Sequence, residues 1–310
     1  MKSLVGYTGF VGGNISAAGS FEGRYNSKNI EEAFGTNPEL LIYAGITAEK
    51  FIANKFPEQD LEIIQNAEKN IQKIHPERLV LISTIDVYED SFHADEETPA
   101  LGQGVYGQHR SLLENWVKEN IEDYLIVRLP ALFGKGIKKN FIYDYIKYIP
   151  ALLNEEKFGQ LSAKRPELKN YYSLNDKGFY ACKALEEEER KVLKNVFKEL
   201  GFSALNFTDS RAVYQFYNLA NLYSDIQKAL EKKIKVLNIT TEPLRSSDVY
   251  QYLTGEIFEN EITDQPAVYD ARTRYFKELG GFVAEDGNGG YLYKKEEVLK
   301  EIKEFTIEEN

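Results

Sequence analysis

The chain has 310 residues, of which 43% are apolar and 28% are charged, so it can bury a large core and lacks the composition of a disordered protein. Its 38 lysine and arginine residues stand against 49 aspartate and glutamate residues, which gives a net charge of −11. This acidic balance argues against sequence-independent binding to nucleic acid and against binding to an anionic membrane surface, because both need a basic footprint.

The sequence predicts neither export nor a membrane segment. No apolar stretch near the start has the length of a signal peptide, and nowhere do about 18 apolar residues follow one another. Cys182 is the single cysteine, which excludes an intrachain disulfide, and the three histidines are too scattered to predict a zinc site. We therefore expect a cytoplasmic protein without a bound metal.

The first 130 residues alternate short apolar runs with longer amphipathic segments. Asp60 is placed to cap a helix whose apolar residues recur every three or four positions up to Ile74, and a second helix includes residues 111–120. This alternation predicts a doubly wound α/β domain with a parallel sheet. Its expected strands are mostly continuous apolar runs, as in strands covered on both faces: 3–5, 21–25 (the weakest), 40–44, 79–82 and 125–127.

The pattern changes after about residue 150. A strong helix is predicted over 185–200, with Gly201 as its C-cap, then a late strand over 236–239 and a closing helix over 294–305. We expect a first domain at residues 1–150, with late returns near 205–240. A smaller, mostly helical region at 151–205 and 241–310 would face the substrate.

A glycine-rich turn, GYTGFVG, follows the first predicted strand and opens a helix. Glycines there permit a tight turn, let backbone amides approach a pyrophosphate and let the helix pack closely on the strand. The helix N-terminus would present positive partial charge to the phosphates. An ordinary glycine-rich turn is the alternative. The predicted dinucleotide-binding residues here are Gly6, Thr8, Gly9, Phe10, Val11 and Gly12.

The end of the second strand bears on the choice of nicotinamide cofactor. It reads RYNSK over residues 24–28 and has no carboxylate to bind the adenosine ribose 2′-hydroxyl. Arg24, Ser27 and Lys28 could instead hold a 2′-phosphate through charge-assisted hydrogen bonds. We therefore expect NADP in preference to NAD, unless these are ordinary loop residues. Further candidate cofactor-binding residues are Asn26 in this stretch, and Ala44 and Gly45 after the third apolar run.

Two hydroxyl groups are predicted to meet at the C-terminal edge of the sheet, where open α/β sheets bind ligands. Thr84 follows the strand at 79–82. Tyr106 and Arg110, spaced four residues apart, would share one face of a helix, while His109 would point elsewhere. A guanidinium beside the phenol is expected to lower the pKa of Tyr106.

These motifs together resemble the extended short-chain dehydrogenases/reductases, the NAD(P)-dependent epimerase/dehydratase family. The resemblance covers roughly the first 140 residues, in the family's order, and implies a Rossmann domain that binds NAD(P) and hydride transfer at a hydroxyl or carbonyl carbon. The motifs that carry it are GYTGFVG at 6–12, STIDVY at 83–88, YGQHR at 106–110 and RLPALFG at 128–134.

The resemblance also implies roles for single residues. Thr84 and Tyr106 would bracket the reacting carbon. Arg110 would bind the nicotinamide ribose and tune the phenol, and Ser83 and Pro130 would lie close to the cofactor. Asp86 falls where some dehydratases of the family carry the acid that protonates a leaving hydroxyl, although it could also be a capping carboxylate.

Two departures from the family pattern bear on activity. Arg110 replaces the family's lysine and cannot relay a proton through a neutral amine. Ala131 stands where the sugar-nucleotide epimerases of the family carry an asparagine that contacts the sugar nucleotide. This difference argues against a UDP-sugar as the substrate. We expect an enzyme acting on a small, sugar-like or phosphorylated molecule, with a homodimer as one option for its assembly. A non-catalytic NAD(P)-binding sensor is the alternative.

Overall fold

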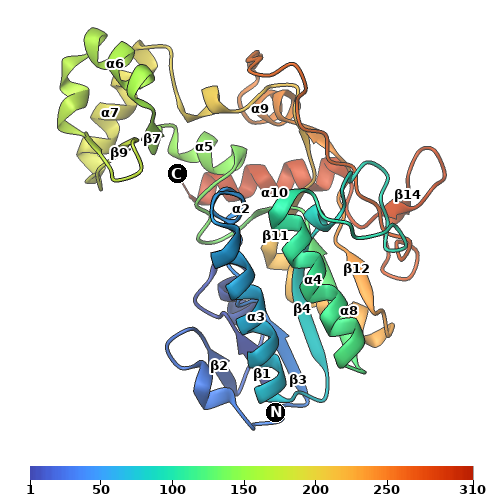
Figure 1. Cartoon of the computed structure of the whole chain (residues 1–310). Helices are drawn as coiled ribbons and strands as arrows, with labels where there is room; N and C mark the ends of the chain where they lie inside the picture. The colour runs from blue at the N-terminus through green and yellow to red at the C-terminus, as the bar shows by residue number, and fades with distance from the viewer. Residues whose placement is uncertain (310) are drawn as a thin grey trace. The chain divides into compact units, whose positions relative to one another are not determined.

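The computed structural model describes residues 1–309, apart from the side chain of Ile52, and divides into two compact units. The first, here called the sheet unit, comprises Met1–Ile137, Val213–Leu244 and Ala267–Ile302. The second comprises residues 138–212, 245–266 and the chain from 303 onward. Figure 1 traces the chain through both, from blue to red.

The division of the chain differs from the expected one, because residues 267–302 belong to the sheet unit. Backbone hydrogen bonds attach this late segment to earlier ones. The Arg272 amide donates to the Ala94 carbonyl at 2.7 Å, and the Leu292 amide donates to the Thr240 carbonyl at 2.9 Å. Contacts between segments so far apart in the chain leave no periodic signal in the sequence. The first segment also ends at residue 137 rather than 150.

A parallel sheet lies at the centre of the sheet unit and confirms the doubly wound α/β prediction. Each strand runs parallel to its neighbours, and Leu4, Ile42, Val80 and Leu125 lie in register across four strands. In spatial order the strands are β12 (Val236–Asn238), β5 (Tyr124–Leu129), β4 (Leu79–Thr84), β3 (Leu40–Tyr43), β1 (Lys2–Val5) and β2 (Gly23–Tyr25).

Helices cover both faces of this sheet. On one face, α1 (Phe10–Ala18) and α8 (Leu222–Glu231) bury alternate strand residues such as Leu4. On the other, α3 (Pro57–Ile74) and α4 (Gly104–Asn120) bury the intervening residues, such as Leu41; these two helices pack side by side (Figure 1). Because successive strand residues face opposite sides, burial of both faces explains why the strands are continuously apolar.

The first half of the sheet is short. A dinucleotide-binding sheet commonly carries three strands in this half, in the order 3-2-1. Here β2 lies at the edge beyond β1, and the connection from β2 to β3 holds only a short 3₁₀ helix, Ile30–Ala33. The adenine end of a bound dinucleotide would therefore meet the loop after β2 rather than a third strand.

Smaller elements complete the sheet unit and its boundary. Short strands outside the main sheet form pairs of their own: β6 (Ala131–Phe133) is parallel to β11 (Phe216–Asn218), and β14 (Phe282–Val283) is antiparallel to β15 (Gly290–Tyr291). The remaining elements are α2 (Lys50–Lys55), β10 (Val213–Tyr214), which pairs with β13 (Leu244–Arg245), and α10 (Lys295–Glu308).

The second unit has its own core of apolar side chains, among them Phe158, Leu168 and Phe197. The predicted helix is α7 (Glu187–Glu199), and Gly201 follows it with a φ of +62°. The unit also contains a three-stranded antiparallel sheet that the sequence pattern did not predict. Its other elements are α5 (Phe141–Lys147), β7 (Leu152–Leu153), α6 (Glu155–Lys164), β8 (Tyr172–Leu174), β9 (Tyr180–Cys182) and α9 (Ser246–Thr254).

The described part of the chain lacks two features, a helix that could cross a membrane and a cluster of metal ligands. None of the helices within residues 1–309 combines the length and the apolar character that a membrane crossing requires. The same residues hold no group of three or more histidine, cysteine, aspartate or glutamate side chains arranged to bind a metal ion.

Candidate functional site

The glycine turn is built by close backbone approaches that exclude a side chain. Gly6 has a φ of +91°, and a Cβ there would lie 2.4 Å from the Ala44 carbonyl oxygen and 2.8 Å from the Gly45 nitrogen. A Cβ on Gly12 would lie 2.1 Å from the Gly6 carbonyl oxygen. These two glycines therefore let β1 turn against the end of β3 and let α1 pack on the turn.

Gly9 differs from Gly6 and Gly12, because its position is open. It is the exposed N-cap of α1, no side chain caps this end, and the first turn carries no acidic residue. A Cβ on Gly9 would have only the Gly6 carbonyl oxygen within 4 Å, at 3.3 Å. The first amides of a helix have no partner within it and carry positive partial charge. The turn, with exposed Thr8 and with Phe10 and Val11 opening α1, therefore fits a pyrophosphate.

The end of β2 lies directly beside this turn, because the Gly6 amide donates to the Tyr25 carbonyl at 2.7 Å. Asn26 holds the tip in shape by accepting a hydrogen bond from the Lys28 amide at 2.8 Å. Arg24, Ser27 and Lys28 are exposed, and Arg24 Nε donates to Ser16 Oγ at 3.1 Å. The structure thus places the predicted 2′-phosphate residues next to the glycine turn.

A cavity of about 120 Å³ collects the remaining candidates at the C-terminal edge of the sheet. It is lined by side chains from α1, from the chain after β3, from β4, from α4 and from the chain after β5. Gly45 and Asp86 lie outside its lining. The sequence-predicted residues that line it are Val11, Ala44, Ser83, Thr84, Tyr106, Arg110 and Pro130.

Tyr106 is buried, and the centre of its ring lies 4.2 Å from Arg110 Cζ. Arg110 favours the phenolate, as expected. Burial is nevertheless the larger effect, and with the nearby Asp86 carboxylate it raises the pKa of Tyr106 above its usual value. The expected net lowering is therefore wrong for the protein without ligands. The Tyr106 phenol is therefore protonated at neutral pH.

Arg110 is held by partners that sequence reasoning missed. Its Nη1 donates to Asp60 Oδ2 and its Nη2 donates to the Thr47 carbonyl, both at 2.6 Å. Asp60 is not the helix cap expected, because α3 begins at Pro57 and the Asp60 side chain is buried against Arg110. His109 also contacts Asp60, with Nδ1 2.8 Å from Oδ2, and it does not line the cavity.

Asp86 accepts hydrogen bonds from two distant segments. Lys50 Nζ, at the start of α2, lies 3.0 Å from Asp86 Oδ1, and the Tyr269 hydroxyl lies 3.3 Å from the same oxygen. The Asp86 amide donates to Thr84 Oγ1 at 3.2 Å, which joins Asp86 to the candidate hydroxyl of Thr84. A Cβ on Gly107 would lie 2.0 Å from the Asp86 carbonyl oxygen, so α4 packs directly on this segment.

A buried polar network lies behind Ser83. The Ser83 hydroxyl donates to Glu114 at 2.7 Å, and Glu114 is paired with Arg128 at 2.6 Å. Arg128 Nη1 donates to the Tyr88 hydroxyl at 2.6 Å, and burial raises the pKa of Tyr88 to about 12. Arg128, from the RLPALFG motif, therefore holds Ser83 through Glu114 and does not reach the cavity itself. Glu114 gave no signal in the sequence beyond its place on the predicted helix.

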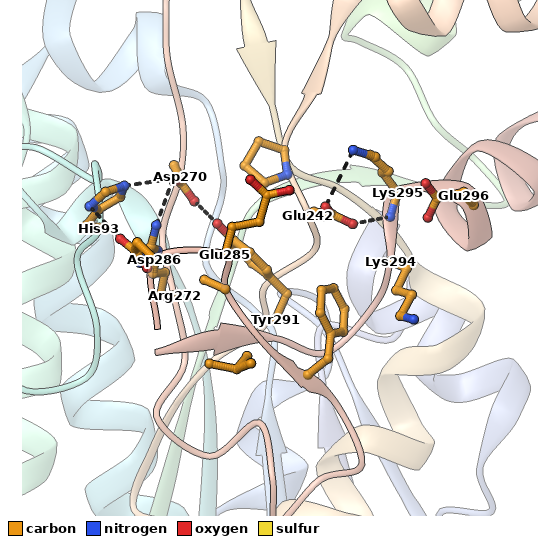
Figure 2. A pocket seen from close by; sticks show the side chains of 14 residues that line it. His93, Glu242, Asp270, Arg272, Glu285, Asp286, Tyr291, Lys294, Lys295 and Glu296 are labelled. Atoms are coloured by element: carbon orange, nitrogen blue, oxygen red, sulfur yellow. Dashed lines mark hydrogen bonds and ion pairs between the residues drawn. The ribbon is translucent and has the colours of Figure 1, made fainter. Parts of the chain in front are cut away.

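A larger cavity, of about 640 Å³, lies elsewhere on the sheet unit and contains none of the predicted site residues. Figure 2 shows that His93, Asp270, Arg272 and Asp286 face one another, and that Lys295 faces Glu242. Asp270 accepts from the Tyr291 hydroxyl and lies 3.2 Å from His93 Nε2, while Arg272 is paired with Asp286 at 2.5 Å. Because these groups are paired with one another and none of the predicted site residues lines this cavity, it is a weaker candidate than the one at Tyr106.

Several solved structures are similar to this chain in fold. The dTDP-4-dehydrorhamnose reductase of Bacillus anthracis, in complex with NADP, is 14% identical over 99% of this chain and 97% of its own, with a TM-score of 0.61. The UDP-N-acetylglucosamine 4-epimerase of Methanobrevibacter ruminantium is 9% identical over 99% and 96%, with a TM-score of 0.61. An NAD-dependent NDP-hexosamine 5,6-dehydratase is 13% identical over 87% of each chain, with a TM-score of 0.57.

The likeness extends over nearly the whole chain and shows a Rossmann-type α/β fold. This is the fold class that the sequence predicted. No protein-family model matches the sequence. No curated protein sequence is significantly similar to it either.

Proposed function

We propose that the protein is an NADP-dependent oxidoreductase that transfers hydride at a hydroxyl or carbonyl carbon of a small molecule. The observation that carries this proposal is the cavity beside the glycine turn, lined by Thr84, Tyr106 and Arg110 together. The open N-terminus of α1 supports a dinucleotide there, and the Bacillus anthracis reductase of the same fold holds NADP.

The residues at the cavity have separate tasks. When bound, the nicotinamide supplies or accepts the hydride. Tyr106 donates a proton to the substrate oxygen, because its raised pKa keeps the phenol protonated at neutral pH. The Thr84 hydroxyl orients the same oxygen. Arg110 is a positioning residue: Asp60 and Thr47 fix its guanidinium, and it packs against the Tyr106 ring.

The direction of the reaction follows from Tyr106 and Asp86. A protonated phenol suits reduction of a carbonyl, which consumes a proton at oxygen. Dehydration would need Asp86 as an acid, but Asp86 accepts hydrogen bonds from Lys50 and Tyr269, which suits a carboxylate acceptor. We therefore propose a net reduction, with the reverse oxidation as its partner, rather than a dehydration.

A non-catalytic NADP sensor is the second candidate. Arg110 favours it, because the guanidinium is committed to Asp60 and Thr47 and cannot act as a proton-relaying amine. The two candidates differ in turnover. Both bind cofactor, whereas only the reductase consumes NADPH.

The test is NADPH consumption with a panel of aldehydes, hydroxyketones and nucleoside-diphosphate ketosugars, followed by absorbance. Tyr106→Phe should lower turnover by at least about a hundredfold, the scale of a lost general acid, and leave NADPH affinity unchanged. Wild-type protein that binds NADPH but consumes none with any compound would favour the sensor. An active Tyr106→Phe variant would remove Tyr106 from the mechanism.

A further inference from the structure

Lys50 lies next to the proposed reaction site, and the sequence analysis did not single it out. It begins α2, shortly after the C-terminal end of β3, the edge at which parallel sheets bind ligands. Its Nζ lies 3.0 Å from Asp86 Oδ1, 2.8 Å from Gln103 Oε1 and 3.5 Å from the Tyr269 hydroxyl. Four segments far apart in the chain thus meet at one ammonium group.

We infer that Lys50 is a substrate-binding residue of the proposed reductase, and that its ammonium donates to an oxygen of the substrate beside the reacting carbon. This inference rests on the proposed function. Asp86 holds the ammonium in place and accepts from a substrate hydroxyl. The substrate class that satisfies both groups is a carbonyl compound with hydroxyl groups on neighbouring carbons.

Two contacts place Lys50 close to Tyr106. The Tyr106 amide donates to Asn54 Oδ1 at 3.2 Å, one turn along α2 from Lys50. Lys50 itself contacts Gln103, the N-cap of α4, on which Tyr106 lies. Helix α2 is therefore fixed to the start of α4 at two points. Asp86, which Lys50 contacts, also lies close enough to Tyr106 to raise the pKa of its phenol.

The hydrogen-bond geometry leaves Lys50 able to bind one more oxygen. An ammonium has three donors. Two of them make bonds of ordinary length, to Asp86 and Gln103, whereas the 3.5 Å contact to Tyr269 is at the long limit for a hydrogen bond. Tyr269 also contacts Asp86, so it keeps a partner when a substrate oxygen takes the third donor.

The exposure of the pair also suits binding rather than support of the fold. The Lys50 side chain is 40% exposed and that of Asp86 is 16% exposed. Ion pairs of such exposure contribute little to stability. By contrast, the cation of the YGQHR motif is buried and committed to Asp60 and Thr47, so it is not available to a substrate. Lys50 is partly exposed, so its ammonium group can donate to a substrate oxygen.

The test compares Lys50→Met, Lys50→Arg and a control, Lys55→Met, with the wild type. Lys55 lies at the other end of α2, is exposed, and packs over the rings of Phe51 and Phe56. Each protein is titrated with NADPH, melted, and assayed with hydroxyketones and nucleoside-diphosphate ketosugars. Matched ketones that lack the neighbouring hydroxyl are assayed beside them.

We expect Lys50→Met to raise KM for the hydroxylated substrates about 10- to 100-fold, the effect of losing one charge-assisted hydrogen bond. The loss should be much smaller for ketones that lack the hydroxyl. Lys50→Arg should recover part of the affinity, because it restores the charge. NADPH affinity should be unchanged, and the melting temperature should stay within about 2 °C of the wild type. Lys55→Met should behave as the wild type does.

Each other result overturns the inference in a recognisable way. An active wild type with a Lys50→Met variant of equal KM shows that Lys50 does not bind substrate, and leaves the reductase standing. A Lys50→Met variant that melts well below the wild type, with equal losses for all ketones, shows a purely structural role. A wild type that turns over nothing removes the proposed function, and the inference with it.

Discussion

The protonation state of Tyr106 determines how the proposed reaction depends on pH. Burial raises its pKa, and the effect of Arg110 does not offset this. The phenol is therefore protonated at neutral pH and titrates above the usual range for tyrosine. A reduction needs the protonated phenol, and an oxidation needs the phenolate. The same residue thus predicts opposite pH dependences for the two directions.

The pH profile of kcat/KM tests this prediction. Reduction should be level from about pH 7 to pH 10 and fall only above that range. Oxidation should rise about tenfold per pH unit over the same interval, because the phenolate fraction does. A reduction rate that declined between pH 7 and pH 9 would mean that the phenol ionises early and that the cation beside it prevails over burial.

Asp60 holds the Arg110 guanidinium in place, and its replacement should destabilise the fold. Asp60→Asn leaves the buried Arg110 guanidinium without its counter-charge. Breaking one partner of a buried ion pair typically costs about 3–5 kcal/mol of unfolding free energy. Denaturant titration measures the change. Glu58→Gln, an exposed acid in the same turn of α3, is the matched control and should change stability by less than about 0.5 kcal/mol.

We propose that the tip of β2 distinguishes NADP from NAD. Charge-assisted contacts to a 2′-phosphate contribute roughly 1.5–3 kcal/mol each, so even one favours NADP by about tenfold. Replacing Arg24 and Lys28 together with alanine should erase this preference and leave NAD affinity unchanged. Calorimetric titration of both cofactors provides the comparison. If the double variant still prefers NADP by tenfold, other residues make the distinction.

Among the structural elements, the turn between β1 and α1 contains two glycines with different predicted roles. Gly12 is needed for the stability of the fold, and Gly9 is needed for cofactor binding. Gly12→Ala places a Cβ 2.1 Å from the Gly6 carbonyl oxygen, so α1 must move away from the turn. We expect a loss of about 1–3 kcal/mol in unfolding free energy, the usual cost of overpacking. Gly9→Asp should keep or slightly raise stability, because aspartate is a good N-cap, yet abolish cofactor binding by repelling the pyrophosphate.

Denaturant titration and calorimetry on the two glycine variants give the comparison. The prediction is a crossed result, in which Gly12→Ala loses stability and Gly9→Asp loses binding alone. A Gly9→Asp variant that binds NADPH with wild-type affinity would place the pyrophosphate somewhere other than the N-terminus of α1.

The elements that the sequence predicted share a strong local signal. β3 and β4 are continuous apolar runs, and the stripe of α3 repeats every three or four residues, so periodicity alone locates them. The motif residues Thr84 and Tyr106 line one cavity because β4 ends, and α4 begins, at the same edge of the parallel sheet. Local pattern and topology were enough for these.

The supporting contacts could not be predicted, because they join distant segments. Asp60 and Arg110 are fifty residues apart, and Lys50 and Tyr269 are 219 apart. Nothing in the composition of α3 distinguishes Asp60 from the exposed acids around it. The net pKa of Tyr106 also depends on how deeply the fold buries it, which the motif spacing does not show.

Across the whole molecule, the sheet is short on the side of β1 and β2. The similar enzymes match the chain over most of its length, although β2 ends the sheet where a third strand is common. We therefore propose that a nicotinamide dinucleotide binds at the glycine turn although this half of the sheet lacks a third strand.

Calorimetric titration of the wild-type protein with NADPH and with NADH tests that claim most directly. We expect the wild-type protein to bind one NADPH per chain, with an affinity at least about tenfold above that for NADH. We expect the Gly9→Asp variant to bind neither cofactor. The absence of a binding signal with either cofactor, from a wild type that melts cooperatively, would contradict it.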